Sequence, residues 1–137
     1  IVALTDQSIS QAWSNVTSAA IGTSAQSSWD GLSNSNSIVG QADHTSSAAK
    51  LCLGVVSGGR SDWYLPCIQE LNMLWNNYYT VARALSQISG ATQLSDSVYW
   101  SSSEYFSSHA WGFSLGAGYP YYDGKDVTFY VRAVRAF

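Results

Sequence analysis

The last third of the chain alternates large apolar side chains with small or polar ones, and this pattern constrains the fold more than any other feature. Trp111, Phe113 and Leu115 alternate with glycine and serine, and the same period of two returns over residues 128–131. Successive side chains of a strand point to opposite faces, so this period predicts half-buried strands whose large apolar residues point inward. The small and polar residues should then face outward.

Between these strands the chain is rich in tyrosine, serine and aspartate, a composition close to that of antibody combining loops. Tyrosine offers a large contact area at low entropic cost, while serine, glycine and aspartate supply adaptable hydrogen bonds. We therefore predict a ligand-binding region over about residues 99–137, within a single domain of residues 1–137. The residues expected to contact the ligand are Tyr105, Phe106, Ser107, Ser108, His109, Gly112, Ser114, Tyr119, Tyr121, Tyr122, Asp123, Asp126, Thr128 and Tyr130.

A second set of residues is predicted to form a structural frame beneath this surface. The frame consists of Trp63, Trp100, Glu104, Trp111, Lys125, Arg132 and Arg135, and its last segment runs to Phe137. Each buried tryptophan would stabilise the fold by roughly 3 kcal/mol or more relative to alanine. The charged residues are expected to tie the loops to the sheet through charge-assisted hydrogen bonds, although exposed charges would contribute little. One of the two arginines should face inward, because they stand at a period of three beside an apolar strand.

Three segments show helical patterns. Residues 10–19 carry apolar side chains at helical spacing and predict a short helix in a part of the chain that otherwise serves as scaffold. Asp43–Ser47 offers N-cap residues before an apolar run that ends at Gly58-Gly59, which predicts a second helix. A third helix is expected from Pro66 to Asn77, where proline suits the first turn and the following apolar residues share a face.

Composition excludes several classes of function. Charged residues make up 11% of the 137 residues, against about 25% in an average protein. The net charge of −3 leaves no basic patch for a phosphate backbone, so nucleic acid is not expected as a partner. Nothing resembles a membrane-spanning segment or a signal peptide, so we expect no direct membrane insertion. The abrupt start at Ile1 leads us to expect a fragment or a processed form whose upstream anchor or export signal was removed.

The two cysteines, Cys52 and Cys67, do not fit a zinc-binding pattern. They form either a buried free pair or a structural disulfide. A disulfide across a loop of this size would stabilise the fold by roughly 3 kcal/mol and would indicate an oxidising compartment. The sequence leaves both alternatives open.

Several separated motifs together resemble a known family. They are Gly59, Asp62-Trp63-Tyr64-Leu65-Pro66, Glu70-Leu71, Tyr99-Trp100-Ser101-Ser102-Ser103-Glu104, Trp111, Lys125 and Val131-Arg132-Ala133-Val134-Arg135. They are similar to the Lcl C-terminal family, also called DUF1566, a branch of the C-type lectin fold akin to formylglycine-generating enzymes. The resemblance spans roughly residues 42–137 and implies an α+β domain with two helices packed beside a twisted, mostly antiparallel sheet. It also implies that the first and last strands pair near the chain ends.

A subset of that family serves as variable proteins of diversity-generating retroelements, in which an adenine-rich template is copied with errors into the 3′ end of the gene. Errors at the adenines of an AAC or AAT codon give Tyr, Ser, Asp, His and several other residues, but never Trp, Lys, Glu, Gln or Met. Between Tyr105 and Val131 the only excluded residues are Trp111 and Lys125, both in the frame. The resemblance therefore implies an extracellular receptor-recognition protein on a prokaryotic cell surface or a phage or virus particle. Its partner would be a protein or glycan ligand on another cell or host surface.

Enzymatic functions find little support in the sequence. A formylglycine-generating enzyme would require reactive cysteines late in the chain, and none follows Cys67. Ser107, His109 and Asp123 contain the residue types of a catalytic triad, but no glycine-framed nucleophile elbow accompanies them. We therefore expect neither catalysis nor a cofactor.

A calcium-dependent lectin is the closest rival in fold. Calcium requires several oxygen ligands, and the chain has neither the Glu-Pro-Asn nor the Gln-Pro-Asp triplet of such lectins. Asp123 and Asp126 are near enough to share an ion, but a loop salt bridge or plain solvation explains them better, so no metal is expected. The alternative function is a surface adhesin that does not diversify, or a metal-independent lectin that stacks sugars on Tyr119, Tyr121 and Tyr122.

Overall fold

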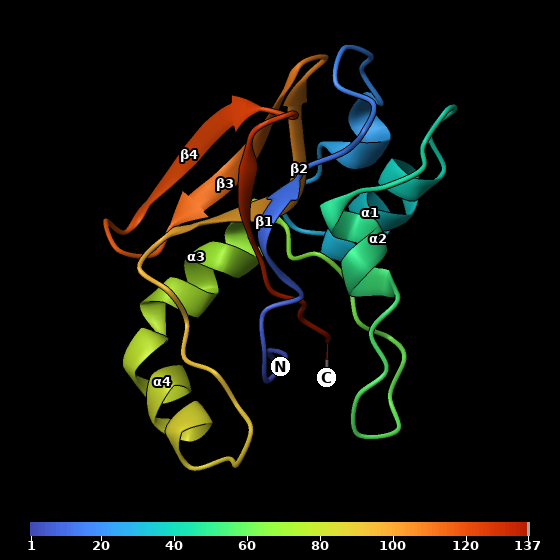
Figure 1. The fold of residues 1–137 in the computed structure, drawn as a ribbon. Coiled ribbons are helices and arrows are strands. Elements are labelled where there is room, and N and C mark those ends of the chain that lie inside the picture. Colours follow the sequence, from blue (N-terminus) through green and yellow to red (C-terminus); the bar gives the residue numbers. More distant parts are fainter. Residues whose placement is uncertain (137) are drawn as a thin grey trace.

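The computed structural model describes residues 1–136, and Phe137, the last residue of the frame segment, lies outside the described residues. Four α-helices and five strands form an α+β fold within this range (Figure 1). In chain order the elements are β1 (Ser8–Ala12), the short 3-10 helix η1 (Thr23–Ala25), α1 (Gly31–Val39), α2 (Ala48–Leu53), α3 (Ile68–Asn76), α4 (Tyr78–Ser86), β2 (Val98–Phe106), β3 (His109–Ser114), β4 (Tyr119–Gly124) and β5 (Thr128–Val131).

The five strands make one open sheet in the order β1-β5-β2-β3-β4. All neighbouring strands are antiparallel except β2 and β5, which run parallel. The first and last strands pair as the family resemblance implied, and a further bridge between Val2 and Val134 holds the two ends of the chain side by side. The strands predicted from the period of two are therefore confirmed.

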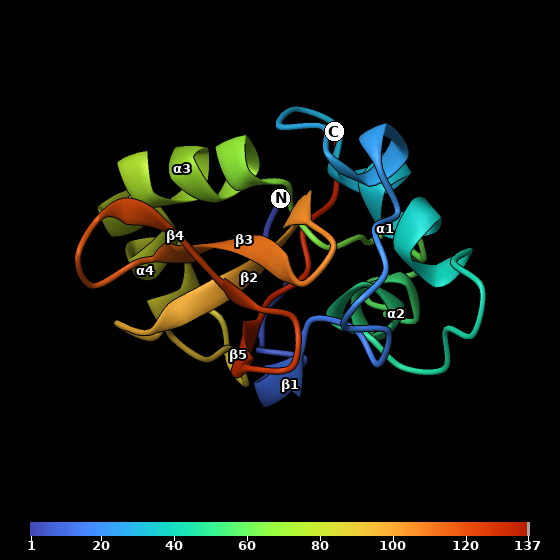
Figure 2. The same ribbon diagram turned by 90° about the horizontal axis from the view of Figure 1, so that it is seen from above.

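The sheet separates two apolar cores. Figure 2 shows α3 and α4 beside one end of the sheet and α1 and α2 beside the other. Trp13, Ile38 and Trp100 belong to the first core, and Leu71, Leu74, Tyr99, Phe113 and Leu115 belong to the second. Tyr99 and Trp100 are adjacent in β2 yet enter different cores, so this part of β2 is buried on both faces.

The predicted helix over residues 66–77 is confirmed as α3. Glu70 accepts a hydrogen bond from the backbone N–H of Cys67 at 2.8 Å, which satisfies a donor at the helix start. Helix α2 begins as predicted, because the hydroxyl of Ser47 accepts from the N–H of Lys50 at 3.0 Å. It ends at Leu53, earlier than the Gly58-Gly59 limit that the sequence suggested.

The helix expected over residues 10–19 is wrong, because the chain from Ser8 to Ala12 is strand β1. Pairing with β5 and the complete burial of Trp13 determine this conformation. The indole N–H of Trp13 donates to the carbonyl of Ser101 at 2.8 Å, and its backbone N–H donates to the carbonyl of Lys125 at 3.0 Å. These distant contacts outweigh the local helical spacing.

The expectation of two helices is also corrected, because α1 and α4 were not predicted. Helix α1 has the composition GLSNSNSIV, which favours helices poorly. It is stabilised by contacts outside itself: Asp30 accepts from the N–H of Ser33 at 2.9 Å, and the buried amide of Asn34 donates to the carbonyl of Ser27 at 2.6 Å. Helix α4 has apolar residues at helical spacing, Tyr78, Val81 and Leu85, which pack on the second core, but the predicted helix stopped at Asn77 and did not include them.

The two cysteines are free and buried, which decides against the disulfide alternative. Burial raises the pKa of Cys67 to about 12 and raises the pKa of Cys52 further. Both thiols are therefore protonated and behave as core side chains. The thiol of Cys67 also donates a hydrogen bond to the carbonyl of Ser28 at 2.9 Å.

Candidate ligand-binding site

A buried ion pair lies beneath the tips of strands β2 to β4. Lys125 Nζ lies 2.8 Å from Glu104 Oε2, and both side chains are fully buried. The carboxylate of Glu104 also accepts from the backbone N–H groups of Ile21 and Gly22, each at 2.9 Å. Lys125 donates a second hydrogen bond to the carbonyl of Ala19 at 3.2 Å. The pair thus joins β2, the turn after β4 and the N-terminal loop.

These bonds determine the charge state of Glu104. Burial alone would raise the pKa of its carboxyl group, but the backbone N–H of Ile21, the ammonium of Lys125 and the N–H of Gly22 outweigh burial and lower the pKa. Glu104 is therefore a carboxylate at neutral pH. Two charges and two backbone donors form a network in which no partner can be removed without leaving another one unpaired.

Of the two frame arginines, Arg132 faces inward and Arg135 lies near the surface. Arg132 is 1% exposed, and its Nε lies 2.8 Å from the carboxylate of Asp6. The rest of its guanidinium donates to the carbonyls of Ala3, Thr92 and Gln93 at 2.8–3.1 Å. Arg135 pairs with the exposed carboxylate of Asp62 at 2.7 Å. The inner arginine therefore fastens the N-terminal segment and the loop before β2 to the end of β5.

The three tryptophans of the predicted frame do not share one environment. Trp63 is 5% exposed and Trp100 is fully buried, so both lie in the core. The prediction that Trp111 points into the core is wrong, because its ring is half-buried and contacts surface aromatics. Trp111 and Phe113 do share a face of β3, but Phe113 packs against α3, with 6.2 Å between its ring centroid and that of Trp75.

Five aromatic rings meet at the end of the β2–β3 hairpin and form what we term the aromatic cluster. Its members are Tyr105, Phe106, His109, Trp111 and Tyr122. The ring of Tyr105 lies 4.8 Å from those of Trp111 and Tyr122 and 5.0 Å from that of Phe106, measured between centroids. His109 stacks on Phe106 at 4.6 Å. Tyr105, Phe106 and Tyr122 remain 42–48% exposed, so the cluster is a surface feature and not a core.

Strand pairing explains why these residues gather. Trp111 in β3 lies opposite Tyr122 in β4, and His109 lies opposite Phe106 across the β2–β3 turn. Irregular pairing on both sides of Glu104 shifts the register of β2 as it leaves the core. Tyr105 thereby comes over the ring of Trp111.

A second group of predicted residues lies on the opposite face of the hairpin. Ser114 pairs with Tyr119, and Gly112 pairs with Tyr121, whose ring lies 6.2 Å from that of Phe129. Tyr119 and Tyr121 are exposed, but Gly112 is buried. A Cβ at position 112 would lie 2.8 Å from the carbonyl oxygen of Tyr99. The assignment of Gly112 to the ligand surface is therefore corrected: it permits close packing of β3 on β2.

The remaining predicted residues are scattered around these two faces. Ser107 and Ser108 form the β2–β3 turn, and Ser108 Oγ lies 2.9 Å from Nδ1 of His109. Asp126 and Thr128 are exposed. Tyr130 is half-buried against Tyr99, with 5.3 Å between ring centroids. Its ring therefore packs against the second core and not toward a ligand.

The structure also shows how the residues considered for a catalytic triad and for a metal site are arranged. Asp123 accepts from the N–H of its neighbour Gly124 at 2.8 Å, and the hydrogen bond of His109 goes to Ser108. Ser107, His109 and Asp123 therefore form no hydrogen-bonded chain in the described structure. Over residues 1–136 no group of three or more His, Cys, Asp or Glu side chains is arranged to hold a metal ion.

Comparison with known protein families matches residues 3–135 to the Lcl C-terminal domain. The chain belongs to the Lcl C-terminal domain family. The match covers strand β1 as well as the motifs that carried the resemblance. No curated protein matches the chain. Among residues 1–136 of this Lcl C-terminal domain, no helix has the length and apolar character needed to cross a membrane.

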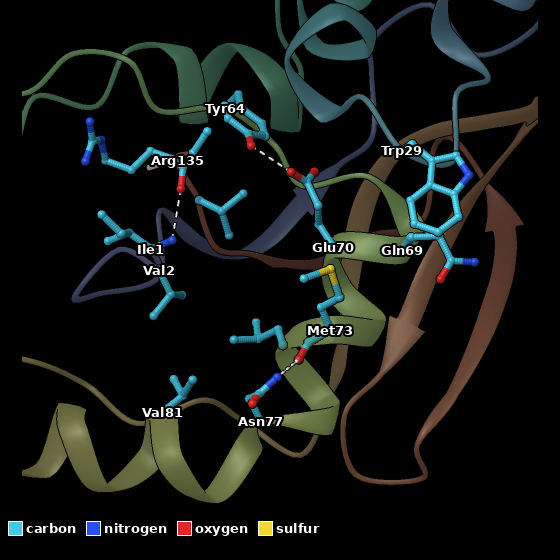
Figure 3. A pocket seen from close by; sticks show the side chains of 13 residues that line it. Ile1, Val2, Trp29, Tyr64, Gln69, Glu70, Met73, Asn77, Val81 and Arg135 are labelled. Carbon is cyan, nitrogen blue, oxygen red and sulfur yellow. Dashed lines mark hydrogen bonds between the residues drawn. The ribbon is translucent and has the colours of Figure 1, made fainter.

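A pocket of about 500 Å³ lies elsewhere on this Lcl C-terminal domain, between α3, α4 and the two ends of the chain (Figure 3). Several of its polar groups have partners within the protein: the hydroxyl of Tyr64 donates to Glu70 at 2.6 Å, and the amine of Ile1 donates to the carbonyl of Arg135 at 2.9 Å. No residue predicted to contact the ligand lines it. The pocket offers a ligand chiefly apolar contact with side chains such as Met73 and Val81.

The sequence missed one functional candidate in the cluster, because it assigned Trp111 to the frame alone. The period of two correctly placed Trp111 on the face of Phe113. The sequence pattern does not show where helix α3 stops covering that face of the sheet. A tryptophan whose opposite strand carries consecutive tyrosines, here Tyr121 and Tyr122, is the nearest available hint.

Proposed function

We propose that this domain binds a macromolecular ligand through the aromatic cluster, without catalysis, as a variable protein of a diversity-generating retroelement with a C-type lectin-like fold. The observation that carries the proposal is the five-ring exposed cluster above a fully buried ion pair. Large aromatic side chains that stay exposed on a rigid support are typical of binding surfaces. The nearby loops supply exposed polar groups such as Asp126 and Thr128.

The separation of frame and surface supports the retroelement part of the proposal. Lys125, which adenine-directed errors cannot produce, is fully buried and neutralises Glu104. Trp111, the other excluded residue, lies beneath Tyr105 and Tyr122 in the cluster. The exposed members Tyr105, Phe106 and Tyr122 all belong to the permitted types. Replacement of the exposed residues would leave the ion pair and both cores in place.

The proposed partner is a protein or glycan on another cell or host surface, and the proposed location is extracellular, on a prokaryotic surface or a phage or virus particle. Support comes from the cluster's exposure and from the chain's resemblance to the subset of the family that serves as variable proteins. An invariant adhesin or a metal-independent lectin would use the same face. Only variation between sibling copies distinguishes these functions.

The decisive experiment is to sequence the DNA around the 3′ end of the gene. The proposal expects a near-copy of the segment encoding residues 105–131, with adenines wherever the two copies differ, together with a reverse transcriptase gene. The codon for Trp111, which contains no adenine, should be identical in both copies. Absence of both the near-copy and the reverse transcriptase would contradict diversification and leave a fixed binding module.

The binding surface itself is tested on protein and glycan arrays with the purified domain. Any ligand that binds should be lost by the double variant Tyr105→Ala and Tyr122→Ala. The matched control is Tyr79→Ala, which removes a tyrosine that is 88% exposed on α4 and far from the hairpin in the sequence. Equal loss in both variants, or none in the double variant, would overturn the assignment of the site.

A further inference from the structure

The aromatic cluster presents ring faces that have no cation within the protein. Over residues 1–136 the one contact between a cation and a ring is Lys125 with Trp13, 4.9 Å from the ring centroid and inside the frame. Tyr105, Phe106 and Tyr122 are 42%, 43% and 48% exposed. Aromatic faces carry negative electrostatic potential and attract cations placed over them.

The charges around the cluster have one sign. The cationic side chains between residues 99 and 136 are Lys125, Arg132 and Arg135, and each forms an ion pair with a carboxylate of the protein. Asp123 lies on the opposite face of β4 from Tyr122, with Tyr121. Asp126 follows in the next turn, and its Oδ1 lies 2.6 Å from where a Cβ on Gly124 would stand, on the face of β4 that carries Tyr122. Its carboxylate belongs to no ion pair within residues 1–136. An anionic ligand would therefore meet an unpaired carboxylate, while the cations of residues 99–136 are already paired.

We infer that the aromatic cluster recognises a protein ligand that presents an arginine side chain, held over the rings of Tyr105 and Tyr122 beside Asp126. This inference rests on the proposed binding function and adds the chemistry of the partner for this sequence. A guanidinium group stacks on aromatic faces while its N–H groups remain free to bond to carboxylates. A neutral glycan could use the rings but would leave the carboxylate of Asp126 without an ionic partner.

The test is an NMR titration of the domain with three blocked peptides that differ only in their repeated residue. The first contains four arginines, the second four citrullines, which keep the shape and lose the charge, and the third four glutamates. The indole N–H signal of Trp111, assigned with Trp111→Phe, reports binding at the cluster. We expect the arginine peptide to bind roughly fivefold or more tightly than the citrulline peptide, and the glutamate peptide to bind least.

Variants separate recognition by the rings from general attraction to an acidic protein. Tyr105→Leu and Tyr122→Leu keep apolar bulk but remove the aromatic face, and each should reduce the preference for arginine over citrulline. Asp126→Asn should reduce it as well, whereas Asp123→Asn, on the other face of β4, and Tyr79→Leu should leave it unchanged. Thermal unfolding of each variant confirms that it is folded.

Three outcomes would overturn the inference: equal affinity for arginine and citrulline peptides, no binding of either, or an arginine preference that survives both leucine substitutions. Each would leave the proposed binding function to the array experiment, where the Tyr105→Ala and Tyr122→Ala variant decides it separately. Capture of a neutral glycan at the cluster would replace the protein ligand with a sugar.

Discussion

The two parts of strand β2 are held by different kinds of contact. From Tyr99 to Glu104 every residue is buried, and directional bonds anchor the chain: the indole of Trp100 donates to Gln11 at 2.9 Å, and the hydroxyl of Ser101 donates to Trp111 at 2.7 Å. At Tyr105 the strand emerges, and ring contacts replace those bonds. The inner part specifies particular residues, whereas the outer part requires only side chains that tolerate exposure.

The largest expected effect comes from breaking the inner part at Lys125. Lys125→Met leaves the carboxylate of Glu104 buried without its cation and should lower the free energy of unfolding by about 3–5 kcal/mol. Urea unfolding monitored by tryptophan fluorescence measures it. The matched control is Glu104→Gln combined with Lys125→Met, which removes both charges and should cost less. If Lys125→Met is at least as stable as the double variant, the ion pair does not anchor the inner part of β2.

Acid should weaken the inner part through the same carboxylate. The folded-state pKa of Glu104 lies below its ordinary value, so its stabilising contribution is complete above the unfolded pKa and disappears as the pH falls through the folded pKa. The free energy of unfolding should therefore be steady above about pH 5 and decrease below about pH 4. Glu104→Gln should flatten this decrease in urea titrations at each pH. An unchanged decrease would assign the acid sensitivity to other carboxyl groups.

A smaller effect is expected at Gly112, which pairs with Trp100 in the inner part of β2. Gly112→Ala places a Cβ against the carbonyl of Tyr99 and should cost about 1–3 kcal/mol of stability through displaced strands. Ser114→Ala, two residues along the same face, serves as the control and should leave the melting temperature nearly unchanged. Full stability of Gly112→Ala with lost ligand binding would restore Gly112 to the ligand surface.

The outer part should separate binding from stability. Tyr105→Ala with Tyr122→Ala should change the free energy of unfolding by less than about 1 kcal/mol each, because both residues lie at the surface and neither belongs to a core, yet should abolish ligand binding. Calorimetry provides the first quantity and the arrays provide the second. A large loss of stability would place these tyrosines in the frame and erase the distinction drawn along β2.

The smallest effect is expected at Arg135, whose partner Asp62 is exposed. Arg135→Ala should shift the unfolding midpoint only slightly, because the pair is open to water and salt at its Asp62 side, where both screen the charges. Arg132→Ala is the comparison at the buried end of the same segment and should shift the midpoint clearly. Equal shifts for both would contradict the difference in their environments.

The sequence predicted those elements whose burial is local and repeating. Leu71 and Leu74 of α3 recur at helical spacing behind a proline, and β3 shows its period of two directly. It failed at Trp13, whose helical spacing was overridden by bonds to residues far along the chain. It also missed α1, because that helix is held partly by a distant segment: the hydroxyl of Ser35 donates to the carbonyl of Leu65 at 3.2 Å.

The sequence predicted which residue types make up the candidate site, but not how they are arranged in space. Tyrosine-rich residues were recognised, but their division between two faces depends on the pairing of Trp111 with Tyr122 and of Gly112 with Tyr121. The alternating pattern alone shows which side chains of a strand share a face. It cannot show that α3 covers Phe113 and leaves Trp111 open. The register and the extent of the covering helix therefore had to come from the structure.

The antiparallel pairing near Val2 and Val134 gives the fold a particular mechanical character. The two ends lie together in Figure 1, on the opposite side of the molecule from the β2–β3 turn. Tension applied through both ends would open this pairing as a zipper, one bridge at a time, and would then reach β1 and β5. The hairpin that carries the aromatic cluster lies outside that line of force, so a bound partner could be held under load without distortion of the surface that grips it.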